Sequence, residues 1–396
     1  MIRKRVSMKV CKPDYYDTFM CVADQCRFTC CRDWTIAVDD ITMKKWHKLK
    51  MPDGFACDKE YLSDLTRVQP STCAIKLLED GTCPFLNENG LCRIVLQYGE
   101  ETLSQTCHTF PRERHEHMHR VEYALSLGCR SVLEHLWKKK DFQVVITEDA
   151  DEEIERFSSH TPEVCFMIRD WFVEIAADRS VSVPDVLRVL FYLILDLDEL
   201  NEKTELTTEA FLTYRNSEIA SLLIEKVKSI DQITMDTFNE NNELLLDIAE
   251  NYRKKKIYAD YLEPIATHAT VYEQALKQND TLTEEKIGQF TIIWQQYEDH
   301  LRTLICEELY ASLLLPNSNI YCMIIKLQWL ALEYVVIRQW LFLHWDLTGS
   351  LEEQDLIEAV SVIFRMTGYS DDDIEEYLES SFESVIWEWG YLSFIL

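Results

Sequence analysis

The sequence predicts a mainly α fold in two parts, a cysteine-rich metal-binding module at residues 1–140 and an acidic all-helical domain at residues 141–396. Two asymmetries predict this division. Residues 1–130 carry 11 of the 14 cysteines and nearly balanced charge, with 19 Lys and Arg against 18 Asp and Glu, whereas residues 131–396 hold 21 against 51. After about residue 160, apolar residues recur every three or four positions, which is the period of packed amphipathic helices.

The composition excludes some classes of function. The net charge of −29 argues against nucleic acid as a direct ligand, because phosphate binding depends on clustered Lys and Arg, and it favours a basic protein partner. Residues 1–12 contain no apolar run long enough for a secretory signal, so we expect a cytoplasmic protein. The most apolar stretch, residues 321–343, contains Lys326, Glu333 and Arg338, which indicates a buried helix and no membrane span.

The front part contains short elements between its cysteines. Residues 34–39 alternate between polar and apolar side chains and predict a short strand, and residues 42–49 predict a short helix. Residues 141–151, a Val-Val-Ile run flanked by acidic residues, predict a strand or an exposed connector. We place the boundary between the two domains there.

Helical stripes follow one another through the rear part. Pro184 and Pro316 stand where helices should start or stop, and Ser350 and Ser370 begin capping patterns ahead of the last helices. The predicted helices cover residues 163–177, 186–197, 209–224, 244–252, 258–277, 285–315, 321–345 and 374–382.

The first cysteine cluster is the strongest chemical signal in the chain. Cys21, Cys26, Cys30 and Cys31 lie within eleven residues. Thiolates at such spacing on a turn can converge on one soft metal ion or cluster, and Zn²⁺ and Fe–S clusters both favour such ligands. A reducing cytosol argues against disulfides. Because neighbouring side chains diverge, Cys30 and Cys31 need not both bind the same metal.

A second cluster comprises Cys83, Cys92, Cys107 and Cys129. Residues 87–90, Asn-Glu-Asn-Gly, predict a tight reversal that could bring Cys83 and Cys92 together. The eight cysteines of the two clusters suffice for one four-thiolate centre with spares or for two centres, and their spacing does not choose between these arrangements.

The other cysteines lack the spacing of metal ligands. We expect them to be structural residues, since free cysteine is among the most buried residue types. They are Cys11, Cys57, Cys73, Cys165, Cys306 and Cys322. Of the histidines, His108 beside Cys107 is a better candidate for a ligand than His115, His117 and His119, which predict an exposed run.

The front motifs together resemble the flagellin lysine-N-methylase family, within a wider group of proteins that have a zinc- or iron-chelating cysteine domain. The resemblance covers about residues 15–130. It is carried by the first cysteine cluster followed by Trp34 and Asp39, the Cys83-Pro-Phe-Leu to Cys92 turn, Gly99, and Cys107-x-x-Phe110-Pro111-Arg112. One departure is Gly128-Cys129-Arg130, where the family typically has Ser-Cys-Pro, so Cys129 is the least secure correspondence.

The resemblance implies a protein lysine N-methyltransferase that acts on flagellin. It also implies S-adenosylmethionine (SAM) as the methyl donor and an iron-sulfur cluster of the 4Fe-4S type, with zinc as the alternative metal. The metal ligands that transfer from the family motif are Cys21, Cys26, Cys30, Cys31, Cys83, Cys92 and Cys107.

The residues themselves say little about where SAM would bind. No glycine-rich loop follows a strand, and the Cys-x3-Cys-x2-Cys spacing of radical SAM enzymes is absent, so a SAM site would be unconventional. An iron with an open position could bind the amino-acid part of SAM. Trp34 and Tyr98 are candidates for an aromatic wall, Asp39 and His108 for a base, and Arg112 for the partner of a carboxylate. The sequence assigns none of them a catalytic role.

Functions of other classes fit the cysteines equally well. A non-catalytic iron- or zinc-binding module, such as a metal chaperone or a cluster-bearing partner protein, would lack SAM binding. A redox sensor would need exposed thiols of low pKa. The acidic rear part serves solubility or, alternatively, steers a lysine-rich protein substrate. The donor site, the number of methyl groups added and the oligomeric state do not follow from the sequence.

Overall fold

The computed structural model describes residues 8–55, 58–68, 73–149, 159–230, 234–276, 281–382 and 385–396. Helices dominate this part of the chain, which confirms the prediction of a mainly α fold. Cys57, residues 150–151 of the predicted connector and residue 277 of a predicted helix lie outside the described residues.

A four-stranded sheet joins the start of the described chain to residues 112–149. Its strand order is β5-β6-β1-β7. β1 runs parallel to β6, with Lys9 opposite Arg120, and antiparallel to β7. The strands are β1 (Met8–Pro13), β5 (Arg112–Glu116), β6 (Arg120–Leu125) and β7 (Val144–Asp149), so the predicted connector begins with a short loop and continues as a strand.

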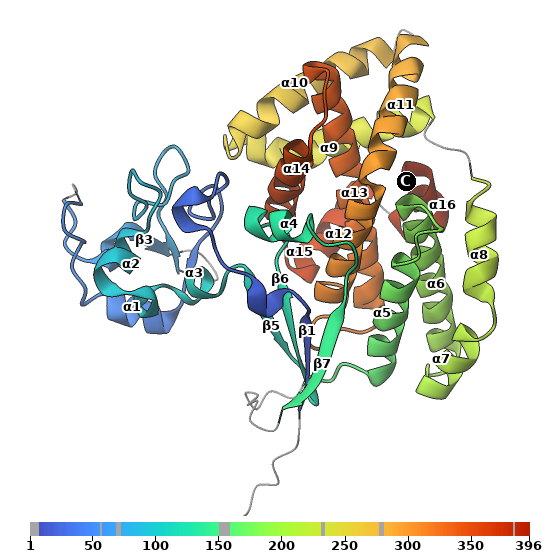
Figure 1. The fold of residues 1–396 in the computed structure, drawn as a ribbon, viewed down its shortest axis with the longest axis horizontal. Helices are drawn as coiled ribbons and strands as arrows, with labels where there is room; N and C mark the ends of the chain where they lie inside the picture. The colour runs from blue at the N-terminus through green and yellow to red at the C-terminus, as the bar shows by residue number, and fades with distance from the viewer. Residues whose placement is uncertain are drawn as a thin grey trace, which may run out of the picture.

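The cysteine-rich segment builds a small layer of its own around a three-stranded sheet in the order β2-β4-β3. Its core includes Trp46, Leu62, Phe85 and Ile94, each 1% exposed or less. The elements are β2 (Ala37–Val38), α1 (Asp40–Trp46), β3 (Thr66–Val68), β4 (Cys73–Ile75), α2 (Arg93–Tyr98) and α3 (Gln105–Thr109). The predicted strand and helix of this region are therefore present in shortened form, and the layer stands to one side of the helical body (Figure 1).

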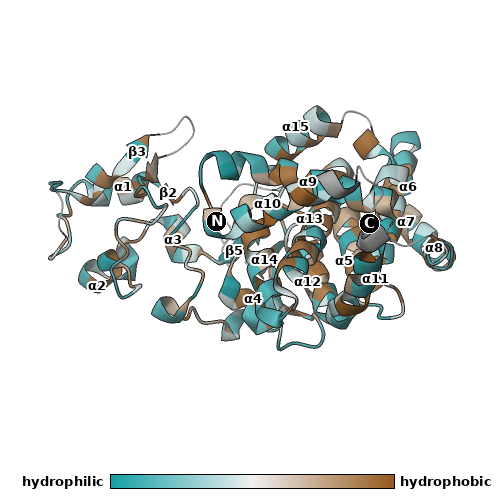
Figure 2. Cartoon of the chain, turned by 90° about the horizontal axis from the view of Figure 1, so that it is seen from above, coloured by the Kyte–Doolittle hydropathy of each residue, from teal (hydrophilic) through white to brown (hydrophobic). Residues whose placement is uncertain are grey.

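The helical body surrounds one long central helix, α13, 29 residues from Ile320 to Thr348. By length and composition α13 could cross a membrane, but 83% of its most apolar window is buried inside the protein. Seen from above in Figure 2, hydrophobic residues concentrate on the helices at the centre of this body. The other helices are α4 (Arg130–Leu136), α5 (Glu163–Ala176), α6 (Val183–Lys203), α7 (Thr208–Arg215), α8 (Ile219–Val227), α9 (Met235–Lys254), α10 (Ala259–Leu276), α11 (Thr281–Trp294), α12 (Glu298–Ala311), α14 (Glu353–Met366), α15 (Asp371–Phe382) and α16 (Trp389–Ile395).

The structure divides two of the predicted helices. The helix predicted at residues 209–224 is broken after Arg215, where α7 ends, and Glu218, with φ of 62°, is the residue before α8. The helix predicted at residues 285–315 passes through a single 3-10 turn, Gln295–Tyr297, between α11 and α12. On both sides of each break the apolar residues recur with a helical period. The period alone therefore predicted one continuous helix.

The capping predictions have a mixed outcome. Ser370 caps α15 as expected, accepting a hydrogen bond from the Asp373 N–H at 3.3 Å. Ser350 does not cap α14, because the capping residue is Glu352, paired with Asp355 in a reciprocal box. A carboxylate two residues further along therefore provides the cap that the Ser350 pattern suggested.

Candidate functional site

A thiol cavity of about 90 Å³ lies inside the cysteine-rich layer. Five of the seven predicted metal ligands line it together with apolar side chains that include Trp34 and Phe110; the five are Cys30, Cys31, Cys83, Cys92 and Cys107. The two cysteine clusters, more than fifty residues apart in sequence, therefore meet at one place.

Local backbone geometry explains how these thiols come together. The side-chain oxygen of Asn87 accepts hydrogen bonds from the N–H groups of Asn89 and Leu91, both at 2.9 Å, and Gly90 has φ of 75°. This reversal brings Cys83 and Cys92 to the same cavity, as predicted. The Cys83 N–H donates to the carbonyl of Cys31 at 2.8 Å, which links the second cluster to the first.

The remaining cysteines of the clusters lie beside this cavity without lining it. Cys21 is exposed and Cys26 is half-buried. Burial raises the pKa of the Cys26 thiol, and Cys30 and Cys21 raise it further by their proximity. Cys129, the least secure of the correspondences, is buried near Cys30 and Cys26, and its pKa is raised to about 12, mainly by burial. Cys129, which the sequence placed in the second cluster, therefore stays a candidate ligand beside the seven.

The donor chemistry of the cavity fits a soft metal. Burial raises the pKa of Cys83 to about 12 and that of Cys107 to about 11, and among the described residues no Lys or Arg lines the cavity. Such thiols stay protonated unless a bound cation compensates the thiolate charge, which a metal ion does. Within the described part of the chain, no three His, Cys, Asp or Glu side chains already stand in positions that could hold a metal ion. The seven ligands and the choice between zinc and iron therefore stay predictions.

Most of the other predicted site residues have structural partners. Asp39 caps α1, and although burial opposes the effect, the N–H groups of Gln105 and Thr42 lower its pKa to about 2, which makes it a weak base. Tyr98 donates to the carbonyl of Lys50 at 3.0 Å, outside the cavity.

Three further residues of the front part have clear positions. Arg112 donates to the carbonyl of Phe19 at 2.9 Å, and His108 is exposed at the end of α3. The expectation of an exposed histidine run is wrong for His117, which is 3% exposed and lies 3.8 Å from Glu122. Burial of that ring follows from the pairing of β5 with β6, which the sequence analysis did not predict.

Arg365, in the last turn of α14, fastens the helical body to the first cysteine cluster. Its guanidinium donates to the carbonyls of Phe28 and Thr29, each at 2.9 Å, and of Gly128 at 2.7 Å. It also lies 3.9 Å from the centre of the Phe28 ring, a cation–π distance. The Arg365 clasp thus sets the position of the thiol cavity relative to α14.

Beside this clasp lies the central cleft, of about 750 Å³, between the cysteine-rich layer and the helical body. Asp33 and Trp34 line it from the layer, and Tyr252, Lys255 and Tyr369 line it from the body. Trp34 also lines the thiol cavity, so the two spaces share this residue, and its ring nitrogen donates to the carbonyl of Cys30. The volume falls in the usual range for sites that bind a whole small molecule, roughly 300–1,000 Å³.

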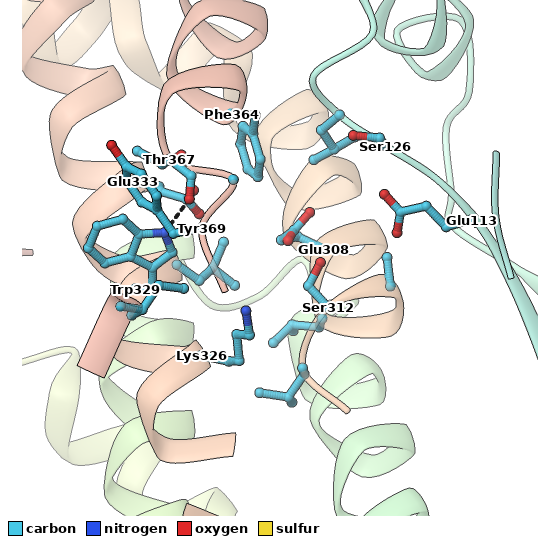
Figure 3. A pocket seen from close by; sticks show the side chains of 17 residues that line it. Glu113, Ser126, Glu308, Ser312, Lys326, Trp329, Glu333, Phe364, Thr367 and Tyr369 are labelled. Atoms are coloured by element: carbon cyan, nitrogen blue, oxygen red, sulfur yellow. Dashed lines mark hydrogen bonds between the residues drawn. The ribbon is translucent and has the colours of Figure 1, made fainter. Parts of the chain in front are cut away.

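A third space, the acidic pocket, has a volume of about 220 Å³ and lies between β5, α12 and α13. Three carboxyls line it: Glu113 from β5, Glu308 from α12 and Glu333 from α13 (Figure 3). Trp329 and Tyr369 contribute aromatic rings. Tyr369, with its neighbour Gly368, also lines the central cleft, so the two spaces adjoin at the end of α14.

The pocket carboxyls differ in their exposure to water, and the pKa of each is raised. Glu333 is 5% exposed, and burial followed by the charge of Glu308 raises its pKa to about 8. Burial also raises the pKa of Glu308, while the charge of Lys326 lowers it. Glu113 lies at the mouth, where its side chain is 39% exposed, and burial and Glu308 raise its pKa. Lys326 pairs with Asp371 at 2.7 Å.

Hydrogen bonding agrees with a neutral Glu333. The Thr367 hydroxyl contacts both the Glu333 carboxyl and the carbonyl of Ile363, the latter at 2.8 Å. One hydroxyl proton serves a single acceptor, so a protonated Glu333 that donates to Thr367 satisfies both contacts. In the sequence, Glu333 and Lys326 stand out only as charged interruptions of an apolar helix. Their position on that helix was the signal that they lie in a buried site.

Comparison with known proteins gives a consistent set of relatives. A family model described as the FliB lysine N-methylase C-terminal domain matches residues 169–395, more than half of the chain. A lysine-N-methylase of Salmonella typhimurium and one of Salmonella choleraesuis are each 32% identical over 133 residues, 33% of this chain and 33% of each relative. The flagellar biosynthetic protein FliU of Salmonella muenchen is 32% identical over 133 residues, 79% of its length.

The extent of these matches is limited. The matched region spans about a third of the length of the two curated lysine-N-methylases. No solved structure matches this chain.

Proposed function

This chain belongs to the family of the FliB lysine N-methylase C-terminal domain, and on that premise we propose that it is a protein lysine N-methyltransferase that acts on flagellin. SAM is the proposed methyl donor, and an iron-sulfur cluster is the proposed cofactor. The observation that carries the proposal is the row of three adjoining spaces: a thiol cavity, a cleft large enough for a cofactor, and an acidic pocket.

The central cleft is the proposed donor site. Asp33 lines the cleft wall, where it pairs with Arg32 at 3.0 Å, and Trp34 and Tyr252 would give a sulfonium aromatic neighbours. Asp33 can occupy this wall because residue 81 is a glycine. A β-carbon at position 81 would clash with the Asp33 carboxylate oxygen, at 2.1 Å. Methyl transfer needs a neutral amine in line with the methyl carbon and sulfur, so the wall residues serve to fix that line.

The predicted cysteines would hold the cluster on the far side of Trp34 from this cleft. When bound, an iron with an open position supplies a Lewis-acidic site for the amino-acid part of the donor. The protein contributes the apolar wall around the thiols and the Arg365 clasp. Together they would fix the position of the thiol cavity relative to the central cleft. The seven predicted ligands remain those of the family motif, with Cys129 as an eighth candidate.

Flagellin as the substrate is supported by the flagellar name of one relative. The acidic rear part of the chain, with 21 basic against 51 acidic residues at positions 131–396, would attract a lysine-rich surface.

Methylation of flagellin by the full chain tests the proposal. Anaerobically purified protein is incubated with flagellin and SAM carrying a labelled methyl group, and flagellin lysines are mapped by mass spectrometry. We expect label on lysine ε-amines, and a loss of at least ten-fold in initial rate for Trp34→Ala, with Tyr98→Phe as the control outside the cleft. Folded, cofactor-loaded protein that labels no lysine would overturn the proposal.

A further inference from the structure

We propose that the acidic pocket between β5, α12 and α13 is the subsite that receives the ε-ammonium group of the substrate lysine. The identity of the carrier as a lysine rests on the proposed function. The preference for an organic cation rests on the pocket alone, through its charge, its size and its aromatic lining.

Acidic side chains outnumber basic ones in the pocket. Among its described lining residues three carboxyls face a single cation, Lys326, and that ammonium is paired with Asp371 at 2.7 Å. Among the described residues, neither Glu308 nor Glu333 forms an ion pair, and Glu113 meets only His115, at 3.6 Å. Buried carboxyls are normally paired, so this arrangement leaves room for an external positive charge.

Glu333 gives an independent indication of a ligand. Its side chain is 5% exposed, and only one of its two oxygens, Oε1, has a hydrogen-bond partner within the described part of the chain, which is Thr367. The second oxygen is left facing the cavity that Glu333 lines. An ammonium with three N–H donors would give this oxygen a hydrogen-bond partner.

Size and shape favour one unbranched side chain. A volume of 220 Å³ is several times the roughly 30 Å³ that a water molecule occupies in the liquid and below the range for whole cofactors. Leu309, Leu330 and Trp329 form apolar wall along which four methylenes can lie. Trp329 donates its ring N–H to the carbonyl of Thr367 at 3.0 Å, and its ring packs edge to face with Tyr369 and Tyr377.

The pocket also lies where the amine would have to react. Gly368 and Tyr369 line both this pocket and the central cleft, so the nitrogen and the methyl donor would meet at the end of α14. There a pocket carboxylate takes a proton from the ammonium. The nitrogen lone pair then forms the N–C bond. The C–S bond breaks at the same time, and the electron pair of that bond stays with sulfur, which leaves as a neutral thioether. Glu308 is the carboxyl available for this step, because Glu333 already holds a proton, and the raised pKa of Glu308 makes its ionised form a stronger base than an ordinary carboxylate.

The test measures binding of a lysine model compound without methyl transfer. Saturation-transfer NMR on the full chain uses Nα-acetyl-lysine N-methylamide, its norleucine counterpart, which lacks the amine, and S-methylmethionine as a sulfonium of similar length. The variants are Glu333→Gln, Glu308→Gln and Glu113→Gln, the last at the solvent-exposed mouth and therefore least disturbing to folding. The matched control is Glu307→Gln, a buried neighbour of Glu308 that does not line the pocket.

We expect the lysine compound to bind the wild type, the norleucine compound not to bind, and each pocket variant to weaken lysine binding at least ten-fold while Glu307→Gln changes it less than two-fold. Lysine binding that survives in all three pocket variants, or a pocket that takes the sulfonium and not the lysine, would overturn the inference. Flagellin methylation in those cases would leave the proposed function standing. Pocket-dependent lysine binding without any methyl transfer would instead reject the function.

Discussion

Single buried carboxyls give this protein an unusual response to pH. Glu333 and Glu307, 5% and 0% exposed, both have a pKa raised to about 8, chiefly by burial. A carboxyl whose pKa is higher in the folded than in the unfolded state holds a proton that the unfolded chain releases. The free energy of unfolding then falls as pH rises from the ordinary value of about 4.5 toward 8.

Glu333→Gln should remove part of this slope. Because the amide stays neutral, the variant should lose less stability than the wild type as the pH rises. We expect its free energy of unfolding, relative to that of the wild type, to increase by on the order of 1–3 kcal/mol from pH 5 to pH 8.5. Urea unfolding at the two pH values measures the difference. The exposed Glu376→Gln should follow the wild-type slope. A wild-type slope in Glu333→Gln would mean that this carboxyl is already ionised in the folded protein.

The Arg365 side chain is predicted to hold the cysteine-rich layer in place. Arg365→Met removes three hydrogen bonds to the carbonyls of Phe28, Thr29 and Gly128, so we expect a loss of about 2–4 kcal/mol in unfolding free energy and of bound metal. Thermal unfolding and metal analysis report the two effects. Arg215→Met, which breaks a surface ion pair with Glu174, should change neither. Full metal content in Arg365→Met would argue against the clasp.

At the scale of elements, the sequence predicted those that depend on local patterns. The helix expected at residues 163–177 matches α5, Glu163–Ala176, because its apolar stripe and its buried face coincide. The sheet that joins β1 to β6 was not predicted, since Lys9 pairs with Arg120 across more than a hundred residues and neither strand alternates clearly. Its absence from the prediction is also why the burial of His117 and the position of Glu113 were missed.

The turn between Cys83 and Cys92 is an element whose role can be isolated. Gly90 has φ of 75°, a conformation that an alanine adopts at a cost of about 1 kcal/mol. We expect Gly90→Ala to lower the metal content of the purified protein by moving the two thiols apart. Gly54→Ala introduces the same strain at φ of 73° in a loop with open space around it, so it should cost similar stability and retain metal. Equal metal content in both variants would show that the turn does not position ligands.

For the molecule as a whole, the sequence indicated candidate site residues but not how they adjoin. The cysteine spacing predicted a thiol centre, and five of the seven expected ligands do line one cavity. The cleft and the acidic pocket depend on Trp34, Tyr369 and Glu333, which come from separate parts of the chain and meet only through tertiary packing. No local pattern encodes such a meeting.

The uneven charge predicts a salt-dependent encounter with a basic surface. If the acidic rear part steers flagellin, raising the ionic strength from about 0.05 M to 0.5 M should weaken flagellin binding several-fold, mainly through a slower association rate. Surface plasmon resonance at the two salt concentrations measures this rate. An unchanged association rate would assign the acidic residues to solubility alone.

The most direct test of the central claim, that a metal centre and a methyl donor adjoin across Trp34, is the visible spectrum of anaerobically purified protein together with its metal content, with and without SAM. The account predicts iron, a broad absorbance typical of an iron-sulfur cluster, and a change in that absorbance when SAM is added. Colourless protein that holds zinc and does not respond to SAM would contradict it and favour a non-catalytic zinc-binding module.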